Sequence, residues 1–340
     1  MATSTDDELI DLTEDGRTRR HPDGGDDRGR GAERPGDVPV SGWKDVALRV
    51  KGEVKQDQVP LLSAGVAFFL LLALFPALAA LVSLYGIFAD PDQVAQQVRD
   101  LTGTLPEDAQ GLITDQLESI TSDQQGIGVT LAVSIAAALW VASSGVKHLI
   151  GAVNAAYDER ETRGFLKLRG LSLGLTVGAI AFAAVAIGVI AVLPTVADQL
   201  PFGSFGRTLV QVGSYVGLAA AFAVGLAVLY RYAPDRDAPR WQWVSWGAAI
   251  ATVVWIVGSV AFSVYVSNFA SYGETYGSIG AVIVLMLWLM VTAFAVILGA
   301  EINSELEAQT AEDSTVGRPR PMGQRDAVKA DDLGEPAAEG

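Results

Sequence analysis

The sequence predicts an all-α, polytopic membrane protein with six transmembrane helices, and three observations support this fold class. The 340 residues are 50% hydrophobic, which is more than an ordinary soluble domain with two polar tails would hold. The apolar residues lie in long blocks with almost no charge, whereas the formal net charge of -15 comes from tails and loops. Six of these blocks are long enough to cross about 30 Å of hydrocarbon as helices.

Three regions follow from this pattern. Residues 1–40 are predicted to be a disordered cytoplasmic tail, because they have almost no consecutive apolar residues and many Asp, Gly and Arg residues, and so bury too little surface to offset their ordering entropy. Residues 41–307 form the transmembrane domain. Residues 308–340 are again polar and are predicted to be a second disordered cytoplasmic tail.

A basic amphipathic helix is expected at 43–55, just before the first span. Trp43, Val46, Val50 and Val54 recur at helical spacing, with several lysines beside them. Such a helix would lie on the cytoplasmic leaflet. The alternative is a solvated helix that packs on the rest of the protein.

The six expected spans are approximately Leu61–Phe88, Gly126–Gly145, Gly170–Val196, Thr208–Tyr230, Trp243–Val266 and Ser278–Ala300. Pro76 lies inside the first span and should kink it, because proline removes one backbone donor and crowds the preceding turn. The kink is either functional or plain architecture that neighbouring helices accommodate.

The loops between the spans predict the orientation. Loops assigned to the inside hold most of the Lys and Arg residues, whereas those assigned to the outside hold only Arg99 and Arg207. The positive-inside rule therefore places both termini in the cytoplasm. The long outside loop, 89–125, contains two apolar stripes at helical spacing and predicts a small extracytoplasmic helical hairpin. Its acidic residues either guard an entrance or form a solvated helix face.

Small residues recur every fourth position in two spans, which lets helix backbones approach closely. We expect these two faces to be buried in intramolecular helix packing, and the alternative is that they line a passage. The residues are Gly170, Gly174 and Gly178 in the third span and Gly213, Gly217, Ala221 and Gly225 in the fourth.

No enzyme site is evident in the sequence. The two histidines, His21 and His148, are far apart and cysteine is absent, so no metal site or cofactor is expected. An acidic chain without clustered Lys and Arg is not expected to bind nucleic acid. Ser143 and Ser144 lie near the inner end of the second span without an evident base, and such serines more often bond to helix carbonyls than act as nucleophiles.

Glu301, at the inner end of the sixth span, is the acid nearest to a span and is followed by Asn303. A carboxylate at a helix end is unfavourable unless the helix continues or a cation lies close by. We therefore expect the helix to continue and Glu301 to face the bundle, with Lys147 or Arg231 as its partner. The alternative is that Glu301 only marks the membrane interface.

Several strings of residues resemble the YihY/BrkB family of bacterial inner-membrane proteins, sometimes labelled ribonuclease BN-like. They are Ala64–Phe69 with Leu72–Pro76, Trp140–Gly145, Tyr230–Pro234, Tyr276–Ala281 and Gly299–Asn303. The resemblance covers about 43–307 and implies six transmembrane helices in the bacterial plasma membrane. It supplies no catalytic residues. Phe68 and Phe69 stand where the family pattern has tyrosines, which removes hydroxyl groups from that helix.

Three functions remain as hypotheses. The first is a non-enzymatic protein that transports or presents a hydrophobic or amphipathic, lipid-like solute, suggested by the small residues and sparse charge of the spans. The second is a structural or regulatory envelope protein that recruits partners through its cytoplasmic helix and tails. The third, a ribonuclease, is disfavoured because the sequence offers no catalytic histidine pair and no basic groove. The oligomeric state cannot be deduced from the sequence.

Overall fold

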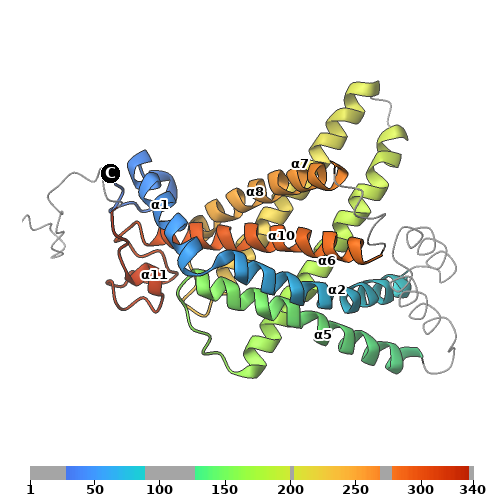
Figure 1. Cartoon of the computed structure of the whole chain (residues 1–340), viewed down its shortest axis with the longest axis horizontal. Helices are drawn as coiled ribbons and strands as arrows, with labels where there is room; N and C mark the ends of the chain where they lie inside the picture. Colours follow the sequence, from blue (N-terminus) through green and yellow to red (C-terminus); the bar gives the residue numbers. More distant parts are fainter. Residues whose placement is uncertain (1–27, 89–126, 200–202, 269–277, 337–340) are drawn as a thin grey trace, which may run out of the picture.

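The computed structural model of the chain describes residues 28–88, 127–199, 203–268 and 278–336. The hairpin predicted at 89–125 lies outside these residues. Six of the described helices are long and apolar enough to cross a membrane, which confirms the predicted fold class (Figure 1). They are α2 (Val59–Phe88), α5 (Ile127–Ala156), α6 (Phe165–Gln199), α7 (Gly203–Tyr232), α8 (Trp241–Asn268) and α10 (Ser278–Glu307). Pro76 lies inside α2, and its kink stays a prediction.

Helix α10 is the centre of the bundle. It packs against α2, α5 and α8, while α6 and α7 contact each other and connect α5 to α8. Figure 1 shows α6 and α7 inclined to α2, α5 and α10. The buried apolar cluster includes Ile150 on α5, Tyr230 on α7, Val244 on α8 and Ile297 on α10. These residues place the tightest packing near one end of the bundle.

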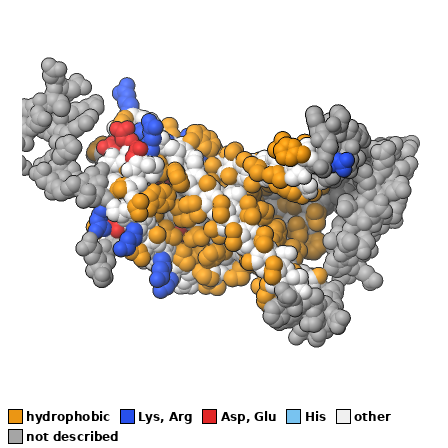
Figure 2. Space-filling view, turned by 90° about the horizontal axis from the view of Figure 1, so that it is seen from above, with side chains coloured by type: hydrophobic (Ala, Val, Ile, Leu, Met, Phe, Trp, Pro, Cys, Tyr) orange, Lys and Arg blue, Asp and Glu red, His pale blue; other side chains and the backbone are white. Residues whose placement is uncertain are grey.

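Charged side chains gather at this same end, which we name the polar end. It consists of helix α1 (Val40–Gln56), the connections 157–164 and 233–240, and the C-terminal segment, residues 308–336. Figure 2 shows Lys, Arg, Asp and Glu side chains at one end of the molecule and a band of hydrophobic side chains beside it. The band suits the hydrocarbon of a bilayer, where exposed apolar side chains meet lipid tails.

Helix α1 packs on the bundle through its apolar face. Val46 and Val50 are buried against Trp243 and Leu306, and the Trp43 ring lies 5.4 Å from the Trp246 ring. This contact agrees with the alternative of a helix packed on the rest of the protein. The opposite face of α1 is exposed to solvent.

The described parts of the two tails, residues 28–40 and 308–336, contain more structure than their composition predicts. Residues 35–37 form a 3-10 helix (η1, Pro35–Asp37), and the C-terminal segment contains α11 (Val328–Asp331). Disorder was expected here, but residues 308–336 are held to α1, α10 and the connections by hydrogen bonds and ion pairs, although they include few apolar residues. A prediction of disorder from low hydrophobicity takes no account of such polar contacts.

The glycine stripes of α6 and α7 also differ from expectation. The residues at these positions are exposed, and a Cβ atom added at any of the glycines would meet nothing within 4 Å. The predicted intramolecular packing of these faces is therefore not what the structure shows. The positions are Gly170, Gly174, Gly178, Gly213, Gly217, Ala221 and Gly225.

Other glycines make the close helix contacts instead. A Cβ at Gly247 on α8 would lie 2.2 Å from the Gly299 carbonyl oxygen on α10, and one at Gly299 would lie 2.3 Å from the Tyr230 hydroxyl. Only glycine permits this approach. A Cβ at Gly145 on α5 would lie 3.1 Å from the Phe69 carbonyl oxygen of α2. These three glycines lie outside the two stripes of small residues with regular four-residue spacing.

Candidate functional site

The last two turns of α10 hold an unusual group of buried polar side chains. Glu301, Asn303, Glu305 and Glu307 are each no more than 2% exposed. The helix ends at Glu307, so it continues past Glu301 as expected. Burial of three carboxylates within seven residues is costly unless each finds a partner, and their partners define the candidate site.

Glu301 faces the bundle, but its carboxylate has no partner in the part of the chain that the structure describes. Both oxygens are buried and neither accepts a hydrogen bond from the described residues. The expected ion pair with Lys147 or Arg231 is not formed. Arg231 instead donates to the Pro239 carbonyl oxygen and lies 4.6 Å from the centre of the Trp241 ring, a cation–π contact at the edge of the bundle.

Asn303 joins two helices. Its Oδ1 accepts from the backbone N–H of Gly247 at 2.8 Å, and its Nδ2 donates to the Val244 carbonyl oxygen at 3.2 Å. These bonds lie beside the Gly247–Gly299 approach. The role of Asn303 in the structure is therefore to hold α10 against α8.

The two serines of the second span have local partners. Ser143 Oγ donates to the Trp140 carbonyl oxygen at 2.8 Å, as expected for a serine that bonds its own helix. Ser144 Oγ accepts from Arg169 of α6 at 3.4 Å. The Arg169 guanidinium lies 3.9 Å from the centre of the Trp140 ring. Neither serine has a nearby base in these contacts, and Ser144, unlike Ser143, joins α5 to α6.

Lys329 of α11 reaches into the acidic group at the end of α10. Its ammonium contacts Glu305 Oε1 at 2.7 Å, Asp158 Oδ2 at 3.0 Å and Glu53 Oε1 at 3.2 Å. The three carboxylates come from α10, the α5–α6 connection and α1, so one lysine links three elements to the C-terminal segment. Arg49 adds an ion pair to the second oxygen of Glu305 at 2.5 Å.

The electrostatics of this group are strongly perturbed. Burial, and the neighbouring charges of Asp158 and Glu53, raise the pKa of Asp57 from 3.8 to about 6. Burial acts to lower the pKa of Lys329, but Glu305 and Asp158 outweigh it and raise that pKa above its usual range. The site therefore favours a cation and disfavours a further negative charge.

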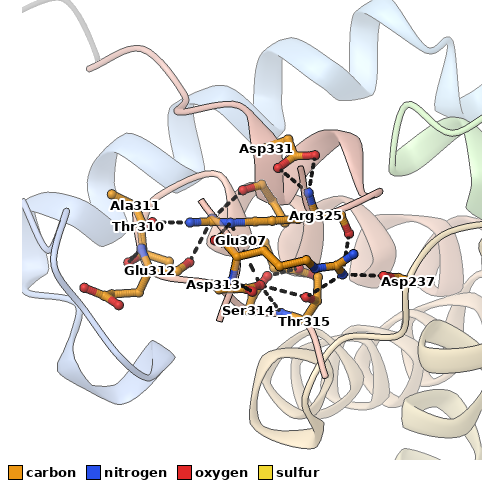
Figure 3. Close-up of polar contacts among 12 residues, drawn as sticks. Asp237, Glu307, Thr310, Ala311, Glu312, Asp313, Ser314, Thr315, Arg325 and Asp331 are labelled. Atoms are coloured by element: carbon orange, nitrogen blue, oxygen red, sulfur yellow. Dashed lines mark hydrogen bonds and ion pairs between the residues drawn. The ribbon is translucent and has the colours of Figure 1, made fainter. Parts of the chain in front are cut away.

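A second buried ion pair fixes the α7–α8 connection. Arg236 and Glu307 approach to 2.7 Å with both side chains fully buried, and Ser314 Oγ of the C-terminal segment donates to Glu307 at 2.5 Å. Figure 3 shows how this segment folds: Arg325 donates to the carbonyl oxygens of residues 311, 312 and 330. Arg325 therefore holds the C-terminal segment in its folded form, and the segment covers the end of α10.

A cavity of about 430 Å³ lies between α2, α5 and α6. Its walls are mainly apolar and include Leu62, Val66 and Leu168, and its polar lining includes Lys147, His148 and Glu161. The imidazole ring of His148 stacks on Phe69 with 3.4 Å between ring centres. Apolar walls with a few polar groups are typical of sites for amphipathic ligands.

Sequence reasoning found Glu301 but missed Lys329, Asp158 and Glu53. Each is a common polar residue outside the spans, and only the folded connections bring them together. No spacing motif joins positions 53, 158 and 329. Among the described residues, no group of three or more His, Cys, Asp or Glu side chains is arranged to hold a metal ion.

The fold and this site define a six-helix membrane protein with a structured polar end. The family model for the virulence factor BrkB matches residues 50–322, and the chain belongs to the BrkB family. This agrees with the resemblance found in the sequence.

Three named relatives extend the comparison. The ribonuclease-like protein YfkH of Bacillus subtilis is 34% identical over 72% of this chain and 88% of its own. A UPF0761 membrane protein of Haemophilus influenzae is 22% identical over 75% of this chain and 91% of its own. One from Vibrio cholerae is 26% identical over 74% and 84%. No solved structure matches the chain.

Proposed function

We propose that this protein binds an amphipathic, lipid-like solute in the cavity between α2, α5 and α6 and moves or presents it at the membrane. The observation that carries the proposal is the cavity itself, with apolar walls beside Lys147 and His148. Acyl chains would contact the apolar walls, and an acidic head group would lie near Lys147. Such a division of polar and apolar contacts is what an amphipathic ligand requires.

Lipid transfer in reconstituted liposomes tests this proposal. Gly151 and Gly65 line the cavity, and a Cβ at either would meet nothing within 4 Å. Gly151→Leu should therefore fill the cavity without disturbing the helix contacts. The matched control is Gly170→Leu, because Gly170 also has open space around it and lies outside the cavity.

The readout is the movement of a fluorescent anionic phospholipid analogue between leaflets, followed by chemical quenching of the outer leaflet. Wild-type protein and Gly170→Leu should accelerate this movement equally, and Gly151→Leu should lose most of the acceleration. Movement no faster with wild-type protein than in protein-free liposomes would overturn the proposal. Equal rates for Gly151→Leu and Gly170→Leu would show that lipid movement does not depend on the cavity.

A second candidate, a structural or regulatory envelope protein, is favoured by the exposed face of α1. Lys44, Lys51 and Lys55 are exposed with Leu48 on this face, and no ion pair of these lysines occurs within the described residues. Such a basic face suits an acidic partner. Reversing the three charges should abolish capture of that partner and leave lipid movement unchanged.

Ribonuclease activity is the least favoured candidate. The name of the Bacillus subtilis relative contains the term ribonuclease-like, so it warrants a direct test. We expect no RNA cleavage by the purified protein, because a ribonuclease needs a metal cluster or a histidine pair beside a basic groove. Cleavage that persists through stringent washing and disappears in a point variant of this chain would refute this expectation.

A further inference from the structure

Glu301 differs from the other buried carboxylates in the described part of the chain. These carboxylates are Asp45, Glu301, Glu305, Glu307 and Asp313. All except Glu301 contact an arginine, at distances between 2.5 and 3.9 Å. Both oxygens of Glu301 are buried and accept no hydrogen bond from the described residues. An ionised carboxylate is costly in such a place, whereas the neutral acid is not, because burial disfavours the charged form.

The groups around Glu301 are mostly acidic. Its titratable neighbours come from α1, the α1–α2 connection, α10, α11 and the end of α5, and they are Glu53, Asp57, Glu305, Lys329 and Tyr157, in that order. Helices α2 and α8 also pack against α10 but contain no Asp, Glu, Lys, Arg or His residue. Lys147 and His148 of α5 line the cavity between α2, α5 and α6 instead.

Lys329 is the cation that acts on Glu301, but its ammonium group is already paired. It contacts Glu305, Asp158 and Glu53 at 2.7, 3.0 and 3.2 Å. An ammonium group has three N–H donors, and these three contacts use all of them. The described arrangement therefore leaves Glu301 without a partner for a negative charge and fits the neutral, protonated acid.

Glu305 can lose Lys329 and still keep a cation. Arg49 Nε contacts the second carboxylate oxygen of Glu305 at 2.5 Å, and the Arg49 guanidinium also donates to the Glu305 carbonyl oxygen at 2.9 Å. Glu301 lies one helical turn away on the same face of α10, with about 5–6 Å between the Cβ atoms of residues at this spacing. A shift of the Lys329 ammonium group by one turn therefore takes it from Glu305 to Glu301.

We propose that Glu301 is a reversible proton-binding site, and that release of its proton moves the ammonium group of Lys329 from Glu305 to Glu301. The O–H bond of the acid breaks, the proton passes to water at the polar end, and Lys329 keeps its own protons. A proton and an ammonium group are thus alternative ligands of one buried carboxylate. The position of α11 follows the protonation of Glu301. The proposal does not rest on the movement of lipids.

Infrared spectroscopy of the full chain tests the proton site, because the C=O stretch of a protonated carboxylic acid is separate from the carboxylate bands and shifts in D2O. A maltoside detergent avoids ester carbonyls. Wild-type protein should show the acid band at pH 7.5 and lose it as the pH is raised, and ¹³C labelling of glutamate carboxyl groups should shift it. Glu301→Gln should lack the band at pH 7.5. Glu312→Gln, a control at an exposed position, should retain it.

A pair of spin labels measures the movement of α11. Val328 on α11 is 43% exposed and Lys44 on α1 is exposed, so cysteines at these positions give two labelling sites in a chain without native cysteine. The distance between the labels should change by about one helical turn, about 5 Å, between pH 7.5 and the pH at which the acid band is lost. It should not change with pH when Glu301→Gln or Lys329→Met is added.

Two infrared results would overturn the proton site: wild-type protein without a glutamic acid band at pH 7.5, or a band that survives in Glu301→Gln. A constant label distance across the same pH range would overturn the movement of Lys329. The same conclusion would follow if the distance changed equally in Glu301→Gln or in Lys329→Met. The infrared measurement on wild-type protein needs no substitution, so it decides on the proton site even if a variant fails to fold.

Discussion

The polar end and the hydrophobic band of this protein are stabilised in different ways. At the polar end, Arg236 and Lys329 have specific carboxylate partners at hydrogen-bond distance. In the band, the glycine stripes of α6 and α7 have open space around them and many apolar side chains are exposed. Lipid is as apolar as leucine, so burial alone gives helices in the bilayer little reason to associate. Close and specific contacts between helices therefore occur where polar side chains pair and where glycines let two helices approach.

The first prediction is that the polar end faces the cytoplasm and the other end of the bundle does not. It has the largest expected effect. Single cysteines at Ser41, Thr162 and Ala238, on the polar end, should not react with an impermeant thiol reagent in intact cells. Cysteines at Ser122, Ser204 and Ser271 should react. The absence of native cysteine makes the background clean. The reverse pattern would contradict the orientation given by the positive-inside rule.

The buried ion pair should be the most sensitive contact of the polar end. Arg236→Met leaves Glu307 buried without its cation, which should lower the free energy of unfolding by about 3–5 kcal/mol. Thermal unfolding of the detergent-solubilised protein measures the loss. Arg318→Met is the control, because Arg318 is exposed and its loss should change stability by less than about 0.5 kcal/mol. Equal effects of the two substitutions would show that the pair contributes little.

Glycines at the close crossing and in the stripes should respond oppositely to alanine. At Gly247 the new Cβ would collide with the Gly299 carbonyl oxygen, so Gly247→Ala should destabilise the protein by about 1–3 kcal/mol. At Gly217 there is open space, and alanine should be neutral or stabilise the helix by up to about 1 kcal/mol. Both melting temperatures should be measured in the same detergent. A destabilising Gly217→Ala would indicate that α7 has a partner on that face.

Asp57 provides the smallest expected effect. Because its folded-state pKa of about 6 lies above the ordinary value of 3.8, the folded protein binds more protons than the unfolded chain between these values. Stability attributable to this group is therefore lost as the pH rises from about 4 to 6.

Asp57→Asn removes the ionised form, so it should raise the melting temperature at pH 7.5 and not at pH 4. The gain should be less than about 1 kcal/mol, because solvent screens a partly exposed group. Asp332→Asn, at an exposed position, should change stability little at either pH. A gain from Asp57→Asn that is equal at pH 4 and pH 7.5 would contradict the cause given for the raised pKa.

The spans were predictable because helix length and hydropathy are local properties. A bilayer requires about 20 apolar residues in each helix, and α8 and α10 meet this requirement without reference to the rest of the fold. The burial of Glu301 was also predictable, since the pattern after it continued the helix. Its missing partner was not, because the positions of Lys147 and Arg231 depend on how helices rotate and tilt.

The polar end could not be predicted from local patterns. Lys329 meets Glu53 and Asp158 across large separations in the sequence, and its own segment resembles a disordered tail in composition. The glycine stripes had the expected spacing, but spacing does not state which face meets another helix. Gly247 and Gly299 form the close contact between α8 and α10. Because they lie on different helices, the spacing within one span does not reveal it.

The central claim is that the protein functions at the polar end, which the cavity between α2, α5 and α6 reaches at Glu161 and where neither oxygen of Glu301 accepts a hydrogen bond from the described residues. Glu301→Gln keeps the shape of the side chain and removes its ability to ionise. Glu312→Gln is the control at an exposed position. In complementation of a deletion strain, at matched protein amount and with unchanged melting temperatures, Glu301→Gln should lose most of the rescue and Glu312→Gln should retain it. Full rescue by Glu301→Gln would contradict the account.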